Sequence, residues 1–318
     1  MANRPKNICS EPVKEVIGRI ENDFYSDIIL AGAEGTGKSV VLNEYVLNAS
    51  DIKNPVINGT VDFKEYIEIY QKNVFELYHV SLIIVQMLLY IKRNQPDKYS
   101  EEIVSFADRI NYILRYIQIM HVYQNYDLKK KEIGNDIYNN PSILLEEFLG
   151  IVTKTLNYEN VTVVIDNFDT FDGANQKYQT YMYKLLKKYM RLIITVSDSE
   201  VLNSDEIKDE LSKDASIVTI NYSNDIAVVK EIIDAHFHDE YTYERVGLIL
   251  SDETIRLIIE KTNGNLFDII KALRYLYTNL SRLQPNQYDE FVIKYIDLRI
   301  NKNPILTGHL KQIRKLMI

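Results

Sequence analysis

The amino-acid sequence predicts an α/β fold in two parts, a core built on a parallel sheet followed by a smaller all-helical domain. Short apolar runs alternate with helical patterns up to about residue 221, as they do where helices join parallel strands. A glycine-rich octapeptide, Gly32–Ser39, separates the first apolar run from a helical pattern. Beyond residue 222 only helical periodicity remains. We therefore expect an α/β domain over residues 1–222, with a helical insertion at about 63–157, and a helical domain over 223–318.

The first half of the core contains two predicted strands and three helical segments. Glu11–Asn22 is predicted to be a helix, because its aliphatic side chains recur on one face. Asp27–Ala31 is an apolar run of the length of a buried strand, and the helix that follows the octapeptide covers Val40–Leu47. Pro55–Val61 is the second predicted strand. A long helical region follows from about residue 63 to residue 120, with a break at Pro96.

The rest of the chain contains the remaining strands and then helices alone. A polar connector that includes Gly134 and Asn135 precedes a helix over Pro141–Asn157, with Ser142 in its first turn. The strands and the helix that complete the core are predicted at Val161–Ile165, Lys177–Lys188, Leu192–Val196 and Ser216–Ile220. The helices of the second domain are predicted at Ile226–His236, Ser251–Lys261, Asn265–Leu280 and Gln287–Ile300.

The octapeptide is a complete phosphate-binding loop of the form G-x-x-x-x-G-K-[ST]. Its glycines let the backbone curl around an anion, and the N-terminus of the following helix adds N–H groups and a positive dipole end. Lys38 is expected to reach the β- and γ-phosphates, and the Ser39 hydroxyl is expected to ligate Mg²⁺. No guanine-specifying Asn-Lys-x-Asp segment is present, which favours ATP over GTP. The predicted nucleotide-binding residues are Gly32, Ala33, Glu34, Gly35, Thr36, Gly37, Lys38, Ser39 and Val40.

A phosphate loop also needs an acidic residue at the end of a neighbouring strand, where a carboxylate holds Mg²⁺ and its waters. Asp166 follows the predicted strand Val161–Ile165 directly and takes this position. The sequence therefore predicts Ser39 and Asp166 as the protein ligands of Mg²⁺.

Residues near Asp166 are candidates for the hydrolytic chemistry. Asn167 stands where a carboxylate would accept a proton from the attacking water, which an amide cannot do. Asp169 is a substitute base, with a cap or turn role as the alternative. Ser197 ends the next strand and is predicted to sense the γ-phosphate. Thr195 is a weaker candidate for that role, because alternation along the strand leaves its direction open.

Composition limits the remaining possibilities. The chain has 318 residues, is 46% hydrophobic and carries a net charge of −8, which argues against a large nonspecific nucleic-acid footprint. Cys9 is the only cysteine, and the N-terminus is polar, so we expect an intracellular protein, in the cytoplasm or, in a eukaryote, the nucleus. The near-apolar stretch Val80–Ile91 is predicted to be a buried helix, too short to span a bilayer. No membrane association is expected.

The order of these motifs resembles that of the AAA+ P-loop ATPases. Gly32–Ser39 is similar to their Walker A motif, Val161–Asp166 to Walker B, and Leu192–Ser197 to the sensor 1 strand. The stretch from Asp166 to Phe171 is similar to origin recognition complex subunits and related replication-initiator ATPases. The segment Lys261–Leu273 resembles the sensor 2 helix of the lid, and its Thr-Asn-Gly-Asn-Leu-Phe part is also similar to STAND signalling ATPases. The resemblance implies a nucleotide bound between an AAA+ core and a helical lid.

The chain departs from that family pattern at three places. Phe267 stands where sensor 2 usually has an arginine, and Lys271, one helical turn further on, is the candidate to replace it, with Arg274 a weaker one. The segment Ser199–Ile220 contains no arginine to act as a finger. Together with Asn167, these departures predict slow or partner-dependent hydrolysis.

The function that the sequence favours is an ATP-dependent assembly switch resembling a replication-initiator subunit. Its expected partners are proteins, either other AAA+ subunits or further copies of the chain. The residues after about 283 are too few for a winged helix, so DNA contact is expected only through the complex. A STAND-like signalling or defence ATPase, and an AAA+ regulator of transposition or plasmid maintenance, are the alternatives.

Overall fold

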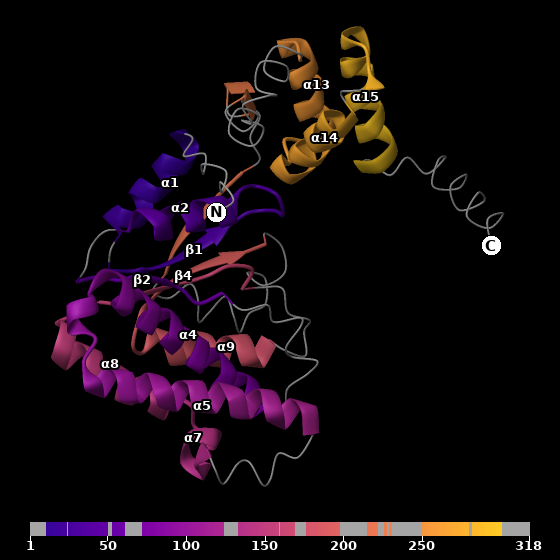
Figure 1. The fold of residues 1–318 in the computed structure, drawn as a ribbon. Coiled ribbons are helices and arrows are strands. Elements are labelled where there is room, and N and C mark those ends of the chain that lie inside the picture. Colours follow the sequence, from indigo (N-terminus) through magenta and orange to yellow (C-terminus); the bar gives the residue numbers. More distant parts are fainter. Residues whose placement is uncertain are drawn as a thin grey trace. The chain divides into compact units, whose positions relative to one another are not determined.

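The computed structural model has a mixed α/β fold with a five-stranded parallel sheet (Figure 1). It describes residues 11–23, 25–49, 53–60, 72–123, 133–158, 160–168, 176–197, 215–221, 226–227, 229–230, 250–279 and 282–300. The chain divides into two compact units. The sheet unit comprises residues 19–31 and 42–218, and the loop unit comprises residues 1–18, 32–41 and 219–318. The phosphate-loop segment thus groups with the C-terminal helices.

The sheet has the strand order β2-β3-β4-β1-β5. Its strands are β1 (Asp27–Ala31), β2 (Val56–Asn58), β3 (Thr162–Ile165), β4 (Arg191–Val196) and β5 (Ala215–Thr219). Every residue of β1, β3 and β4 is buried, which explains why these strands are continuous apolar runs without alternation. Because the strands are parallel, their carboxyl ends all point the same way. Asp166 and Ser197 follow the carboxyl ends of β3 and β4.

Helices cover both faces of the sheet. The helices of this part of the chain are α1 (Glu11–Asn22), α2 (Lys38–Asn48), α4 (Lys72–Asn94), α5 (Glu101–Tyr123), α7 (Asn135–Asn139), α8 (Ser142–Leu156) and α9 (Gln176–Lys187), with a short 3-10 turn, η1 (Pro96–Lys98). In Figure 1, α4 and α9 lie on the opposite side of the sheet from the sheet-unit part of α2, residues 42–48, and α5 and α8 lie further from it. The core joins the sheet to α4, α5, α8 and α9.

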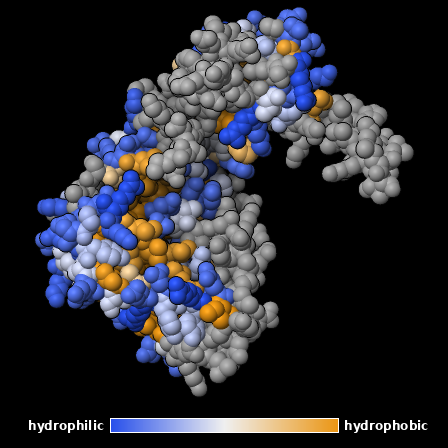
Figure 2. Space-filling view, in the orientation of Figure 1, coloured by the Kyte–Doolittle hydropathy of each residue, from blue (hydrophilic) through white to orange (hydrophobic). Residues whose placement is uncertain are grey.

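Helix α4 forms much of this core. The span Val74–Asn94 is long and apolar enough, by length and composition, to cross a membrane, but about two thirds of its most apolar part is buried inside the protein. The prediction of a buried helix at Val80–Ile91 is confirmed. The expectation that the apolar stretch is too short to span a bilayer is wrong, because the apolar helix extends over Val74–Asn94. Figure 2 shows apolar side chains on the face of the sheet unit where β2 and α4 lie.

The predicted elements agree with the structure at most positions. α1 and β1 have the predicted bounds, and the other strands differ at their ends, β2 most of all. The prediction of a polar connector at Gly134 and Asn135 is wrong, because α7 begins there. α7 buries Ile137 and Tyr138, and a five-residue helix is too short to show a periodic pattern. The first part of the helical region predicted from residue 63 lies outside the described residues.

The C-terminal part of the loop unit consists of helices around a core of its own. Its elements are α13 (Asp252–Lys261), α14 (Leu266–Asn279), the 3-10 turn η4 (Pro285–Gln287), α15 (Tyr288–Tyr295) and a π-helical turn, η5 (Ile296–Ile300). Buried aliphatic side chains of α13, α14 and α15 pack together, and Lys261 pairs with Asp297 at 2.7 Å. Of the helix predicted at Ile226–His236, the structure describes only residues 226–227 and 229–230, which are helical.

Candidate phosphate-binding site

The loop between β1 and α2 has the backbone that its glycines allow. Gly35 and Gly37 have φ values of 85° and 96°, in the left-handed region that favours glycine. Inside the loop, the Thr36 amide and hydroxyl both donate to the Ala33 carbonyl oxygen, at 3.3 and 2.9 Å. α2 begins at Lys38, so the first N–H groups of this helix have no acceptor within it. The loop and the first turn of α2 therefore offer the curled backbone and the amide groups that an anion requires.

Gly32 is required for a different reason. A Cβ at this position would overlap the carbonyl group of Ile220, the residue after β5, so the backbone approaches too closely for a side chain. At Gly37 a Cβ would lie 3.5 Å from the Leu266 side chain, an ordinary contact, so its left-handed φ is the reason for glycine. Gly32 is thus required by close packing, and Gly37 by its backbone conformation.

Lys38 brings a positive charge to the loop. Its side chain is buried, and its ammonium group donates to the carbonyl oxygens of Gly32 and, at 2.9 Å, Ala33. Ser39, the next residue, is exposed in the first turn of α2. A cation inside the loop and an accessible hydroxyl beside it are the chemistry that bound phosphate and Mg²⁺ would use.

The start of α14 contacts the backbone of the same loop. The Leu266 amide donates to the Gly35 carbonyl oxygen at 3.0 Å, and the Asn265 side-chain amide donates to the Glu34 carbonyl oxygen at 3.0 Å. Asn265 was predicted at the start of a helix, without a contact to the loop. Its position directly after a glycine and before a helix was the only local signal.

In the sheet unit, Asp166 is held by one side chain from β4 and one from the segment that follows β2. Its amide donates to the Thr60 hydroxyl at 2.9 Å, beyond the end of β2. Its carboxylate oxygen Oδ1 accepts from the Thr195 hydroxyl of β4 at 2.5 Å. Thr195 is fully buried, whereas Ser197 is exposed beyond the end of the strand. Thr195, the weaker sequence candidate, is therefore the residue that orients the carboxylate, and Thr60 is one that sequence reasoning missed.

Asn167 occupies an uncommon backbone conformation. Its φ is 53°, in the left-handed region that asparagine tolerates better than most residues. Its amide donates to the Thr195 hydroxyl at 2.7 Å and to the Asp166 carboxylate at 3.0 Å. Hydrogen bonds of the Asn167 backbone amide thus hold the turn after β3. The residue at this position, where a general base would stand, has an amide side chain that cannot accept the proton. Asp169 lies outside the described residues, so its predicted role stays a prediction.

A buried histidine supports the chain segment that contains Thr60. His79 of α4 is fully buried, and its Nε2 lies 3.1 Å from the Gly59 carbonyl oxygen. Burial lowers the pKa of His79 to about 4, so the imidazole is neutral near pH 7. Gly59 also donates to the Val164 carbonyl oxygen at 2.8 Å. The segment is therefore anchored on two sides immediately before Thr60.

Lys271 has a partner within its own helix. Its ammonium nitrogen lies 3.9 Å from the centre of the Phe267 ring, and Phe267 is half exposed. A cation over an aromatic face is attracted by the ring quadrupole. Phe267 is the position predicted to correspond to the sensor 2 arginine, and Lys271 is the residue predicted to replace it, so the two compared residues contact each other. The role of Lys271 toward a nucleotide stays a prediction.

The predicted metal ligands are one hydroxyl, from Ser39, and one carboxylate, from Asp166. Among the residues that the structure describes, no group of three or more His, Cys, Asp or Glu side chains gathers. Mg²⁺ usually keeps several waters and is bound through one or two carboxylates together with substrate phosphates. One hydroxyl and one carboxylate match the few protein ligands that Mg²⁺ takes, and the magnesium site stays a prediction.

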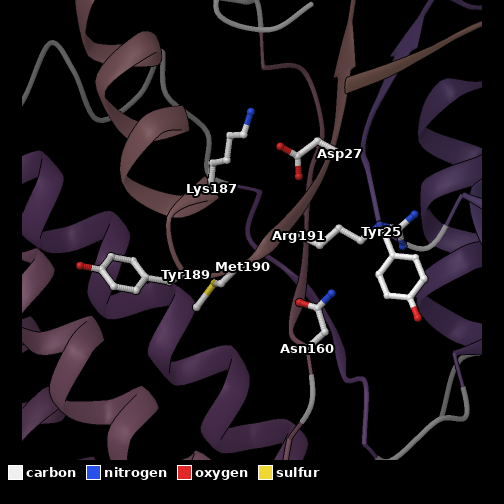
Figure 3. Close-up of a pocket in the computed structure, with 7 residues that line it drawn as sticks. All are labelled: Tyr25, Asp27, Asn160, Lys187, Tyr189, Met190 and Arg191. Atoms are coloured by element: carbon white, nitrogen blue, oxygen red, sulfur yellow. The ribbon is translucent and has the colours of Figure 1, made fainter. Parts of the chain in front are cut away.

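A pocket of about 380 Å³ opens near the amino ends of β1, β3 and β4 (Figure 3). It is lined by Tyr25, Asp27, Asn160, Lys187, Tyr189, Met190 and Arg191. The Asp27 carboxylate accepts from the Tyr183 hydroxyl at 3.0 Å and the Leu192 amide at 2.8 Å. The Arg191 guanidinium donates to backbone carbonyl oxygens. Because these charged groups are engaged within the protein, we interpret the pocket as a structural feature.

Comparison with known proteins does not identify a family. No protein-family model and no curated protein sequence matches the chain.

Proposed function

We propose that the protein binds ATP with Mg²⁺ in the Gly32–Ser39 loop and acts as a nucleotide-dependent switch of the AAA+ type. The observation that carries this proposal is the conformation of the loop, with two left-handed glycines and a buried lysine at the start of α2. The sheet adds support. β1, which leads into the loop, and β3, which leads into Asp166, are separated in the sheet only by β4.

Each residue of the proposed site has one role. Lys38 would pair with the β- and γ-phosphates, and Ser39 and Asp166 would hold Mg²⁺, which supplies charge neutralisation to the phosphates when bound. Thr195 orients the Asp166 carboxylate through its hydroxyl, and Thr60 fixes the Asp166 backbone.

Hydrolysis should be slow in the isolated protein. Asn167 cannot accept a proton, and its backbone is held by Thr195 and Asp166. The Lys271 ammonium group lies over the Phe267 ring, so it would have to leave this aromatic contact to reach a phosphate. We therefore expect a turnover below the typical enzyme value of about 10 s⁻¹. A phosphate-release assay with ATP and Mg²⁺ checks this, and rapid Mg²⁺-dependent release by the isolated protein would contradict it. Stimulation by a partner would indicate an arginine supplied in trans.

We further propose that ATP controls assembly, with other AAA+ subunits or further copies of the chain as partners, and that any DNA contact is made through the complex. A slow hydrolase with an intact phosphate loop is suited to persist in the ATP-bound state long enough to change which proteins it binds. The C-terminal helices of the loop unit are the candidate lid, because α14 contacts the loop backbone directly.

Assembly is testable by mass. In the presence of ATP and Mg²⁺ we expect the 37.2 kDa chain to shift to a larger species, or to co-purify with a specific protein from its own cells. Size-exclusion chromatography with light scattering, followed by identification of co-purified proteins, measures this. The Lys38→Ala variant is the control and should show neither change. A wild-type protein that binds ATP but keeps the same mass and the same partners with and without it would contradict the assembly role.

A further inference from the structure

Asn265 connects the C-terminal helices to the phosphate loop. We propose that Asn265 is a positioning residue for nucleotide binding: its side chain holds the loop backbone at Glu34–Gly35 so that the loop is preorganised for phosphate. This inference rests on the proposed function, because it concerns the same loop. All the contacts that carry it lie within the loop unit.

Two adjacent carbonyl groups of the loop are bound by two adjacent residues at the start of α14. The Asn265 side-chain nitrogen Nδ2 donates to the Glu34 carbonyl oxygen at 3.0 Å. The backbone amide of Leu266 donates to the Gly35 carbonyl oxygen, also at 3.0 Å. The second bond needs no particular side chain, whereas the first depends on the identity of residue 265.

The Asn265 side chain also caps α14, and this fixes its direction. Its oxygen Oδ1 accepts from the amides of Phe267 and Asp268 at 3.0 and 3.2 Å. A rotated amide group would place its NH₂ against two N–H donors, so the cap determines that Nδ2 faces Glu34. Serine, threonine or aspartate would cap the helix as well. Of these polar caps, only asparagine combines the acceptor with an amide donor that reaches the loop.

Gly35 is the complementary feature of the loop. The G-x-x-x-x-G-K-[ST] pattern does not require glycine at this position. Its φ of 85° disfavours other residues, and a Cβ here would overlap the amide group of Asn265. Glycine therefore lets the cap of α14 approach the loop backbone closely.

The bound carbonyl groups determine where the loop amides point. In a trans peptide the N–H group points opposite to the C=O group of the same unit. Because the Glu34 and Gly35 carbonyl groups face α14, the amides of Gly35 and Thr36 face away from it, and the Thr36 amide indeed donates to Ala33 inside the loop. Holding these peptide units in place reduces the ordering cost of closing the loop around phosphate.

The test uses two variants that keep the cap and lose the donor. Asn265→Ser retains a neutral capping oxygen but is too short to reach Glu34, and Asn265→Asp retains the shape but has no N–H. We expect each to bind ATP–Mg²⁺ about three- to tenfold more weakly, the range that one hydrogen bond supports. The negative charge that Asn265→Asp adds repels phosphate, and salt should reduce this part of its loss of affinity. The loss of affinity in Asn265→Ser should not depend on salt.

The matched control is Ser251→Ala. Ser251 caps α13 in the same unit by accepting from the Thr254 amide at 3.1 Å, so its loss destabilises the helices without removing a contact to the loop. We expect this variant to melt at a lower temperature than the wild type and to bind ATP–Mg²⁺ within twofold of it. Hydrogen exchange adds a second readout. In the wild type, the protection of Glu34–Gly35 and of Asn263–Arg274 should rise in parallel as ATP is added. In Asn265→Ser, the protection of one segment should no longer follow that of the other.

The outcomes separate this inference from the proposed function. If Lys38→Ala weakens binding but both Asn265 variants bind as the wild type does, the positioning role is overturned and the proposed function stands. If Ser251→Ala weakens binding as much as Asn265→Ser, helix stability accounts for the effect and the positioning role is also overturned. If the wild type binds no ATP–Mg²⁺, the proposed function fails and this inference fails with it.

Discussion

Replacing Lys38 with alanine is expected to weaken the binding of ATP–Mg²⁺ by roughly tenfold or more, about 1.4 kcal/mol. The Lys38 ammonium group is buried within the loop and donates to the carbonyl oxygens of Gly32 and Ala33. Phosphate oxygens would replace these neutral acceptors with charged ones, which adds the Coulomb attraction between opposite charges to hydrogen bonds that the ammonium group already makes. The variant loses both the hydrogen bonds and the charge, so it should lose more affinity than the removal of one neutral hydrogen bond would cost.

A competition titration against a fluorescent ATP analogue measures this loss. Lys184→Ala is the charge-matched control, because it removes an exposed lysine from α9 in the sheet unit. It should bind ATP–Mg²⁺ as the wild type does. Equal affinity of the wild type and the Lys38→Ala variant would mean that the loop does not hold the nucleotide.

The largest loss of stability is expected from Arg191→Met, about 3 kcal/mol or more of the free energy of unfolding. Arg191 opens β4, is 4% exposed and binds the chain between α1 and β1. Its guanidinium donates to the carbonyl oxygens of Ile20, Asp23 and Ser26, at 2.8, 3.0 and 2.9 Å, and to the Tyr45 hydroxyl at 3.2 Å. Methionine fills similar space but donates no hydrogen bond. The Asp23 carbonyl oxygen keeps the Ser26 amide as a donor at 3.3 Å, whereas the carbonyl oxygens of Ile20 and Ser26 lose the guanidinium, at about 1–3 kcal/mol for each that stays buried and unpaired.

Urea denaturation followed by circular dichroism gives the free energy of unfolding of this variant. Arg109→Met is the matched control, since Arg109 is 41% exposed and pairs with Glu147 on the surface. An exposed ion pair contributes about 1 kcal/mol or less. If Arg191→Met is no more destabilising than Arg109→Met, the buried guanidinium does not hold the end of α1 to the sheet.

The sequence predicted the sheet well because its strands are buried on both faces. Such strands are uninterrupted apolar runs, so β1 could be predicted at its exact bounds and β3 and β4 within a residue of theirs. α7 could not be predicted, because its five residues make little more than one turn and its burial depends on tertiary contacts. Helix periodicity fails for the same reason at any segment shorter than about two turns.

Some residues of the candidate site could be predicted from the sequence, and others could not. The phosphate loop is local in sequence, so Lys38 and its neighbours were predictable from a motif. The groups that hold Asp166 and the loop are not local: Thr60 is 106 residues from Asp166, and Asn265 is 231 residues from Glu34. Thr195 was left as the weaker candidate because strand alternation alone could not assign its direction, which its contact with Asp166 now does.

Calorimetric titration of the protein with ATP, in the presence and absence of Mg²⁺, tests the central claim most directly. If the Gly32–Ser39 loop holds a nucleotide with its metal, one ATP should bind per chain, more tightly with Mg²⁺ than without it, and ADP should compete for the same site. No binding of ATP at saturating concentrations in the presence of Mg²⁺, by a protein that circular dichroism shows to be folded, would contradict the account.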